Sequence, residues 1–161
     1  DILHLDTAAF ALEKHFTHAG RGYNFKIIEG VVPMLTQLGS RYPLAVVSTR
    51  GTAASEAFLA QYSLTSLFPV AVTRESTRRL KPHPAPVQYA AQALGLKPEE
   101  CVMVGDTTVD IISARRAGAW AIGVLCGFGE EKELWRAGAH LVLPTTADLL
   151  AIQALFPAAP V

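Results

Sequence analysis

The sequence predicts an α/β fold, a three-layer, doubly wound parallel sheet of the Rossmann-like kind, and two observations indicate it. Short apolar runs rich in β-branched residues alternate with helical segments of about ten residues. Such alternation is typical of βαβ units whose parallel sheet is covered on both faces. Half of the 161 residues are hydrophobic and 17% are charged, which suits strands buried on both sides. The length suits one domain with a sizeable core.

The apolar runs predict strands, and the segments between them predict helices. The predicted strands are 43–49, 68–75, 101–106, 120–127 and 140–144, and the predicted helices are 29–40, 53–62, 83–96, 108–118, 130–139 and 146–156. Gly118 is expected to end the helix before it. The runs 43–49, 101–106 and 120–126 are expected to be adjacent, or nearly adjacent, parallel strands of one sheet.

The N-terminal segment, residues 1–28, shows a different pattern. Apolar residues recur at helical spacing in it, namely Leu5, Ala9, Leu12 and Phe16. Asp6 or Thr7 could cap such a helix. We therefore predict a helix and a return segment at 1–28, appended to an α/β core at 29–161.

Composition argues against several classes of partner. Fourteen basic residues balance fourteen acidic ones, so no strong net field favours nucleic acid or a membrane surface. No apolar stretch approaches the ~20 residues that span a bilayer. Cys101 and Cys126 lack the spacing of metal ligands. Reduced thiols in a cytoplasmic protein are the predicted state.

The ends of the predicted strands carry the polar residues of interest. In a doubly wound sheet the ligand crevice lies at the carboxyl ends of the strands. Ser48 ends one apolar run and Asp106 ends another, while Lys81 lies in a loop just ahead of a helix. Asp110 follows Asp106 by one helical turn. We expect Ser48 and Asp106 to open on one crevice.

These residue types suit the binding of a phosphoryl group, which needs a cation and fixed donors. Asp106 can ligate Mg²⁺, and Asp110, on the same helix face, can hold a metal-bound water. The Ser48 hydroxyl and the backbone amides after it can donate to phosphate oxygens. Lys81 is a compact charge that can pair with a phosphate and with an attacking carboxylate.

Each of these residues alone has a simpler interpretation. An Asp or Ser at a helix start usually caps the helix, and a loop lysine usually lies at the surface. The order and spacing over four consecutive βα units give the set its meaning. His83 is interpreted as a loop residue, and the other histidines as structural or solvated: His4, His15, His18 and His140.

Together these motifs resemble the haloacid dehalogenase-like hydrolase superfamily, most of all its phosphoglycolate-phosphatase-type members. The resemblance covers roughly residues 26–156. "LAVVSTRG" looks like the second family motif with Ser48 as its hydroxyl residue, and "KPHPAP" looks like the third with Lys81 as its lysine. "VGDTTVDIISARRAG" looks like the fourth, with Asp106 and Asp110 as its acids.

The resemblance implies a magnesium-dependent phosphohydrolase that acts on a small phosphorylated metabolite. Ser48 and Lys81 would be catalytic, and Asp106 and Asp110 would hold Mg²⁺. The substrate would be bound by Ser48, Thr49, Arg50 and Lys81. The segment 1–28 would be the remnant of a cap domain, the part that selects the substrate in this superfamily.

The first motif of the superfamily has no match in the sequence. It is a strand ending in Asp-x-Asp-Gly-Thr, which carries the nucleophile and the general acid/base. Asp6 is the nearest candidate, but Ala8 stands two residues later and no Gly-Thr follows. We expect an N-terminally truncated form of a longer enzyme or a form that has abandoned catalysis. Missing its first strand, the sheet would expose two strand edges, which predicts poor stability or pairing with another copy.

Three classes of function stay open. The first is the phosphohydrolase, and the second is a non-catalytic binding or regulatory module of the same fold. The third is a haloacid dehalogenase-type hydrolase, although "GDTTVD" favours a metal that the dehalogenases of the superfamily do without. The expected partners are a small phosphorylated molecule, neither nucleic acid nor membrane, and a second copy bound through an exposed sheet edge or the cap remnant.

Overall fold

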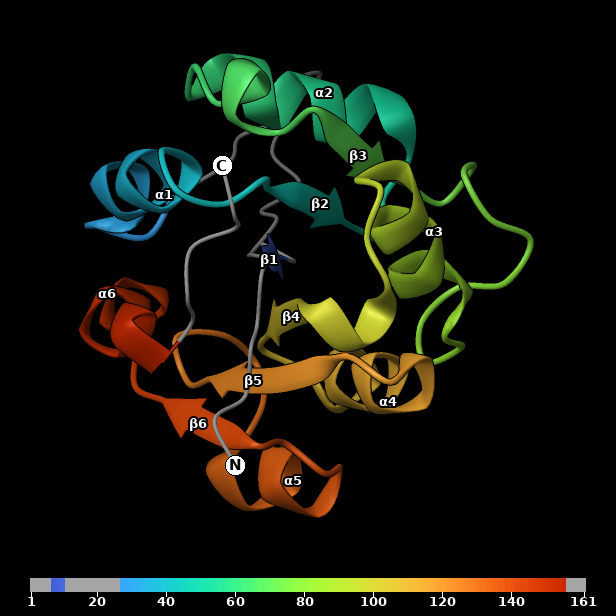
Figure 1. Cartoon of the computed structure of the whole chain (residues 1–161), viewed down its shortest axis with the longest axis vertical. Coiled ribbons are helices and arrows are strands. Elements are labelled where there is room, and N and C mark those ends of the chain that lie inside the picture. Colours follow the sequence, from blue (N-terminus) through green and yellow to red (C-terminus); the bar gives the residue numbers. More distant parts are fainter. Residues whose placement is uncertain (1–6, 11–26, 156–161) are drawn as a thin grey trace, which may run out of the picture.

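A parallel sheet forms the middle of the molecule. The structure, a computed structural model, describes residues 7–10 and 27–155. In these residues six strands pair in the order β3-β2-β1-β4-β5-β6, and every pair is parallel (Figure 1). The strands are β1 (Thr7–Phe10), β2 (Ala45–Val47), β3 (Val70–Val72), β4 (Cys101–Gly105), β5 (Trp120–Val124) and β6 (Leu141–Leu143). The predicted parallel α/β fold is confirmed.

Within residues 29–155 the helices lie where the sequence predicts them, except that the last one is broken. The α-helices are α1 (Val31–Gly39), α2 (Thr52–Gln61), α3 (Ala85–Ala93), α4 (Thr108–Ala117), α5 (Glu131–Arg136) and α6 (Leu149–Ile152), and the 3₁₀ turns are η1 (Thr65–Leu67), η2 (Pro98–Glu100), η3 (Thr146–Asp148) and η4 (Gln153–Leu155). The helix predicted at 146–156 is thus three short pieces. The Asp148 carboxylate accepts the Thr145 N–H at 2.8 Å, and the Asp148 N–H donates to Thr145 O at 3.2 Å, the hydrogen bond of a 3₁₀ turn.

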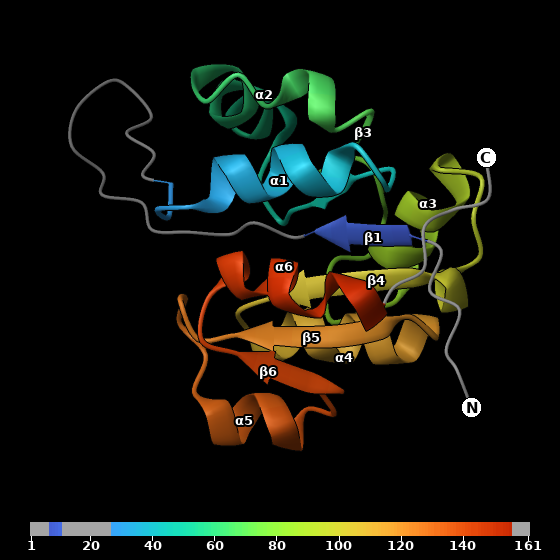
Figure 2. The same cartoon turned by 60° about the vertical axis from the view of Figure 1, so that its left-hand side comes forward.

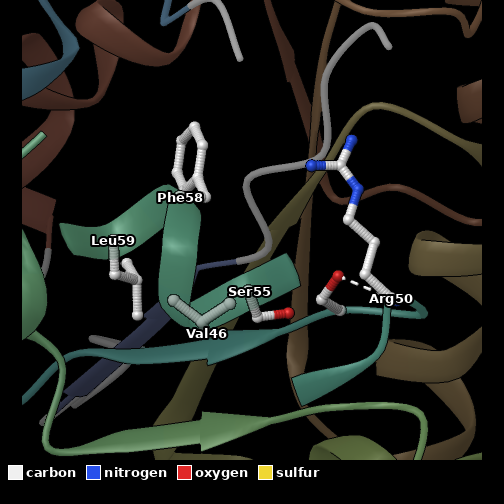
Figure 3. A pocket seen from close by; sticks show the side chains of 6 residues that line it. Val46, Arg50, Ser55, Phe58 and Leu59 are labelled. Carbon is white, nitrogen blue, oxygen red and sulfur yellow. Dashed lines mark hydrogen bonds between the residues drawn. The ribbon is translucent and has the colours of Figure 1, made fainter. Parts of the chain in front are cut away.

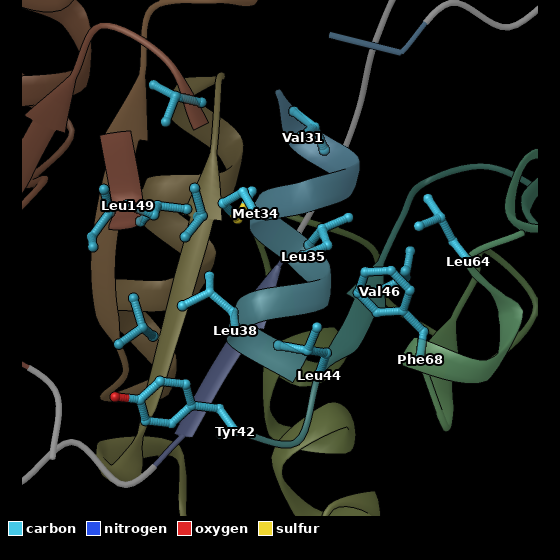
Figure 4. Close-up of a cluster of buried hydrophobic side chains, with 14 of the residues drawn as sticks. Val31, Met34, Leu35, Leu38, Tyr42, Leu44, Val46, Leu64, Phe68 and Leu149 are labelled. Atoms are coloured by element: carbon cyan, nitrogen blue, oxygen red, sulfur yellow. The ribbon is translucent and has the colours of Figure 1, made fainter. Parts of the chain in front are cut away.

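The helices cover both faces of the sheet (Figures 1 and 2). Helices α1, α2 and α6 pack on one face, and α3, α4 and α5 on the other. Strand β4 shows the alternation that follows from its pleat. Val102 and Val104 face the α1 side, and Cys101 and Met103 face the α4 side. Figure 4 shows the first of these cores, where side chains of α1 lie between β2 and Leu149 of α6.

The central strand β1 corrects the prediction for the N-terminus. Residues Thr7–Phe10 form a strand between β2 and β4, with Phe10 opposite both Val46 and Val104. The helix predicted there, and the core without a central strand, are therefore wrong at these four residues. Pairing satisfies the backbone groups of both flanking edges, which outweighs local helical spacing. Residues 1–6 and 11–26 lie outside the described residues, so the cap remnant stays a prediction.

Because β1 lies between β2 and β4, these two strands have no free edges through which the expected second copy could bind. The strands that flank β1 are both paired with it. The outer strands of the described sheet are instead β3 and β6. A homodimer through an edge next to β1 is therefore not available to this fold.

No helix in the described part of the chain combines the length and the apolar character needed to cross a membrane.

Cys101 and Cys126 are free thiols, as the sequence predicts. Burial raises the pKa of Cys101 to about 11, with Glu100 and Glu99 adding to the effect.

His140, beside the amino end of β6, predicts a pH dependence of stability. Its ring stacks on Trp120 with centroids 4.2 Å apart, and its Nδ1 accepts the Ala121 N–H at 2.9 Å. Burial, and then the charge of Arg115, lower the pKa of His140 below its usual 6.5. The unfolded chain therefore binds this proton more tightly than the folded chain, and acid favours unfolding.

We expect the free energy of unfolding to fall as the pH drops from about 6.5 toward the lower folded-state pKa of His140. Urea denaturation at pH 8 and at several values below 6.5 measures this loss. His140→Gln should flatten that part of the profile, and an unchanged profile in the variant would exclude His140 as its cause.

Candidate functional site

The carboxyl edge of the sheet brings the predicted residues together. Ser48 directly follows β2, and its N–H donates to Val72 O at 2.8 Å, which continues the pairing with β3. Asp106 directly follows β4. Because all strands are parallel, both residues lie at the same edge, as predicted, with β1 between their strands. Both are buried, with 7% and 4% of their surface exposed.

Lys81 links the end of β2 to the start of α4, the helix that follows β4. Its Nζ donates to Val47 O at 3.0 Å, next to Ser48, and to Asp110 Oδ1 at 2.6 Å. The side chains of this ion pair are 1% and 0% exposed. Lys81 is therefore a buried cation at the carboxyl edge of the sheet, and the simpler interpretation of it as a surface lysine is wrong.

Asp110 is held on both of its oxygens. Oδ1 takes the Lys81 ammonium, and Oδ2 accepts the N–H and the hydroxyl of Thr107 at 3.1 and 2.6 Å. This is a capping box at the start of α4. A side chain on Gly105 would meet Asp110, since an added Cβ would lie 2.3 Å from its Cβ. The position of Asp110 beside a metal-bound water stays a prediction.

The loop that carries Lys81 is fixed to α4. The Ser113 hydroxyl donates to His83 O at 2.7 Å, and His83 Nδ1 accepts the Ala85 N–H at 3.1 Å. Ser113 is fully buried. His83 thus fixes the loop and the start of α3, in agreement with its interpretation as a loop residue.

The segment after Ser48 lies over a small hollow. Arg50 N–H donates to Ser48 Oγ at 3.1 Å, a local turn that orients the hydroxyl. An accepting hydroxyl still has its own hydrogen to donate. The hollow lies between β2 and α2 and is lined by Val46, Ser48, Arg50, Ser55, Phe58 and Leu59 (Figure 3).

The side chain of Glu75 accepts hydrogen bonds at the start of α2, a contact that the sequence did not predict. Its Oε2 accepts the N–H of Thr52 at 2.9 Å and the hydroxyls of Thr52 and Thr73 at 3.1 and 3.2 Å. The Thr52 N–H contributes most to lowering the pKa of Glu75. Two of the amides predicted to bind phosphate, those of Arg50 and Thr52, therefore bind within the protein.

Asp106 is held by the segment after β5, a contact that the sequence analysis also missed. Its Oδ2 accepts the Phe128 N–H at 2.9 Å, and its main-chain oxygen accepts the Gly129 N–H at 2.8 Å. The signal available in the sequence was the pair of glycines in "CGFG".

The chemistry of Asp106 fits a magnesium ligand. Mg²⁺ is usually bound by one or two carboxylates, with water and substrate phosphate completing its coordination. Among residues 7–10 and 27–155, no three His, Cys, Asp or Glu side chains gather closely enough to hold a metal. Asp106 can thus supply one ligand of a site that needs others.

The strand between Ser48 and Asp106 carries no acid. Residues 7–10 read Thr-Ala-Ala-Phe, and Phe10, at the carboxyl end, is followed by Ala11 and Leu12 in the sequence. Asp6 precedes Thr7, which pairs with Cys101 at the amino end of β4. Asp6 itself lies outside the described residues. The described part of β1 therefore offers no carboxylate nucleophile.

The fold and the site define a class: a Rossmann-like α/β protein with a Ser, a buried Lys and an Asp at one edge of its sheet. The family model described as haloacid dehalogenase-like hydrolase matches residues 4–124. The chain belongs to this family. The match begins closer to the N-terminus than the resemblance found in the motifs, and it includes β1.

Curated relatives carry phosphatase names. A pyrophosphatase PpaX of Bacillus pumilus is 38% identical over 128 residues, which are 77% of this chain and 58% of the relative. A phosphoglycolate phosphatase of Neisseria meningitidis is 35% identical over 102 residues, 63% of this chain and 43% of the relative. The chain thus spans about half the length of the curated relatives it matches.

Solved structures agree on the fold. A predicted phosphoglycolate phosphatase from Haemophilus somnus superposes with a TM-score of 0.74 at 29% identity, over 80% of this chain and 57% of that one. A family hydrolase from Deinococcus radiodurans, solved with bound phosphate and sodium, superposes with a TM-score of 0.69 at 29% identity. That match covers 82% of this chain and 62% of the other.

Proposed function

We propose that this chain forms the core of a magnesium-dependent phosphohydrolase that acts on a small phosphorylated metabolite. The observation that carries the proposal is the position of Lys81, whose Nζ contacts Val47 O beside Ser48 and Asp110 beyond Asp106. One buried ammonium group thereby links the end of β2 to the start of α4. The names of the relatives, which concern phosphate esters and pyrophosphate, support this class of substrate.

In the proposed reaction, the Ser48 hydroxyl and the residues after it, Thr49 and Arg50, bind the phosphate oxygens. Lys81 adds positive charge at the same edge. Lys81, Asp106 and Asp110 together carry one net negative charge, so a phosphate needs a further cation to approach them. Mg²⁺ held by Asp106 would neutralise charge on the phosphate oxygens. The relative solved with phosphate and sodium supports a site for an anion with a cation.

We further propose that the attacking carboxylate comes from an Asp-x-Asp-Gly-Thr strand in a longer form of the protein, as in the superfamily that the motifs resemble. Such a strand would have to replace β1, which fills the place between β2 and β4. The alternative is a non-catalytic binding module, which the acid-free sequence of β1 favours. A dehalogenase would not require a metal at Asp106, so metal binding separates it from the phosphohydrolase. A cytoplasmic location stays a prediction.

Asp106→Asn tests the metal part of the proposal. We expect the parent chain to bind Mg²⁺ weakly in a calorimetric titration, because one protein carboxylate makes a poor site. The variant should bind at least about tenfold more weakly, because an amide oxygen lacks the carboxylate charge.

Asp148→Asn is the matched control, since it also removes one acid charge, from the cap of Thr145 beyond β6. Its Mg²⁺ affinity should equal that of the parent. Equal affinity in Asp106→Asn and the parent would rule Asp106 out as the ligand.

A further inference from the structure

We infer that residues 127–129, called here the 127–129 loop, are a positioning element that fixes the direction of the Asp106 carboxylate. The loop follows β5, and Asp106 follows β4, its neighbour in the sheet. The register places Gly105 opposite Gly123, so the chain that continues from β5 lies beside Asp106. The contact itself is a feature of the fold; its use for Mg²⁺ rests on the proposed function.

Two backbone donors of the loop hold Asp106 at two different atoms. Phe128 N–H donates to the carboxylate Oδ2 at 2.9 Å, and Gly129 N–H donates to the main-chain oxygen at 2.8 Å. The first bond restrains the side chain and the second restrains the backbone. A carboxylate held in this way has a defined direction, which a metal ligand requires.

The glycines of the loop provide the space for this contact. A Cβ on Gly127 would lie 1.7 Å from Asp106 Oδ2 and 2.2 Å from its Cβ and Cγ. A Cβ on Gly129 would lie 2.2 Å from Asp106 O. Neither glycine has the positive φ that favours glycine, so conformational freedom does not explain them. Close approach to Asp106 does.

The distances predict a specific pattern of rescue. Gly127→Ala should lower the melting temperature by roughly 3 to 9 °C, because the added methyl group displaces Asp106. The same change should cost as much in an Asp106→Ala background, where the Cβ remains, but less than about 2 °C in Asp106→Gly. Gly129→Ala should stay costly in every background, because it meets a main-chain oxygen.

Gly39→Ala, at the end of α1, controls for a general effect of alanine. Its Cβ would meet only the ends of the Leu67 and Leu44 side chains, at 3.2 Å or more. We expect the same small shift in parent and Asp106→Gly. If Gly127→Ala costs as much in Asp106→Gly as in the parent, the inference is overturned.

Hydrogen exchange provides a second measurement that does not require Asp106→Gly to fold. In Asp106→Ala the Phe128 amide loses its acceptor, so it should exchange at least about tenfold faster. The Gly129 amide keeps its main-chain acceptor and should exchange at the parent rate. An unchanged rate for Phe128 would contradict the inference.

A titration with Mg²⁺ alone connects the loop to the proposed function. Gly127→Ala should weaken Mg²⁺ binding about tenfold at a temperature at which the variant is still folded. Failure of the parent chain to bind Mg²⁺ would refute the metal site of the proposed function. The melting and exchange measurements would still decide the inference about the loop.

Discussion

Lys81→Met should lower the free energy of unfolding by about 3–5 kcal/mol, the usual cost of removing one partner from a buried ion pair. The substitution keeps an apolar stem of similar length but leaves Asp110 charged, with none of its side chain exposed. It also leaves Val47 O without the lysine donor. Urea denaturation measures the loss, which is a large part of the 5–15 kcal/mol typical of a domain.

The double variant Lys81→Met, Asp110→Asn separates lost packing from the unpaired charge. Asparagine is neutral, and its carbonyl oxygen can still accept from Thr107 as Asp110 Oδ2 does. We expect the double variant to be more stable than Lys81→Met alone. A double variant as unstable as the sum of both single changes would show that the ion pair contributes nothing beyond the two side chains.

Most of the fold could be predicted because its signals are local. The apolar run ahead of Asp106 forms β4, as predicted. Gly118, with a φ of 89°, ends α4 as expected. The central strand could not be predicted in this way. Thr7–Phe10 lie in a segment with helical spacing, and only the edges of β2 and β4, distant in the sequence, make them a strand. Non-local pairing therefore overrode the local pattern.

The position of the site could be predicted, but its contacts could not. Parallel strands place Ser48 and Asp106 at one edge whatever the loops do. The ion pair joins residues 29 positions apart, and nothing in the spacing shows that Lys81 faces Asp110. The contact of Phe128 with Asp106 likewise depends on the path of a loop. The ends of the strands thus predict where the candidate site lies, while the paths of the loops determine which side chains form hydrogen bonds or ion pairs there.

The ion pair also limits what Lys81 can do in catalysis. In the proposed reaction, Lys81 with its ammonium on Asp110 would orient and compensate charge but would offer no nucleophile. Among the described residues, the Ser48 hydroxyl accepts the Arg50 N–H and has no hydrogen bond with a His, Asp or Glu side chain that could act as its base. In the proposed reaction, neither Lys81 nor Ser48 would therefore be the group that attacks phosphorus.

We expect the 161-residue chain to hydrolyse phosphate esters roughly 10⁶-fold more slowly than an ordinary enzyme, the scale of loss when a hydrolase is deprived of its covalent nucleophile. The described residues can bind a phosphate and offset its charge, but the described part of β1 supplies no carboxylate to attack phosphorus. Phosphate release from phosphoglycolate, pyrophosphate and a panel of small phosphate esters, with Mg²⁺, measures the rate. A longer chain whose Asp-x-Asp-Gly-Thr strand can replace β1 between β2 and β4 should restore ordinary turnover, and Lys81→Met in that chain should lower it again. Ordinary turnover by the 161 residues, abolished by Asp6→Asn, would show instead that Asp6 is the nucleophile and that the site is complete within this sequence.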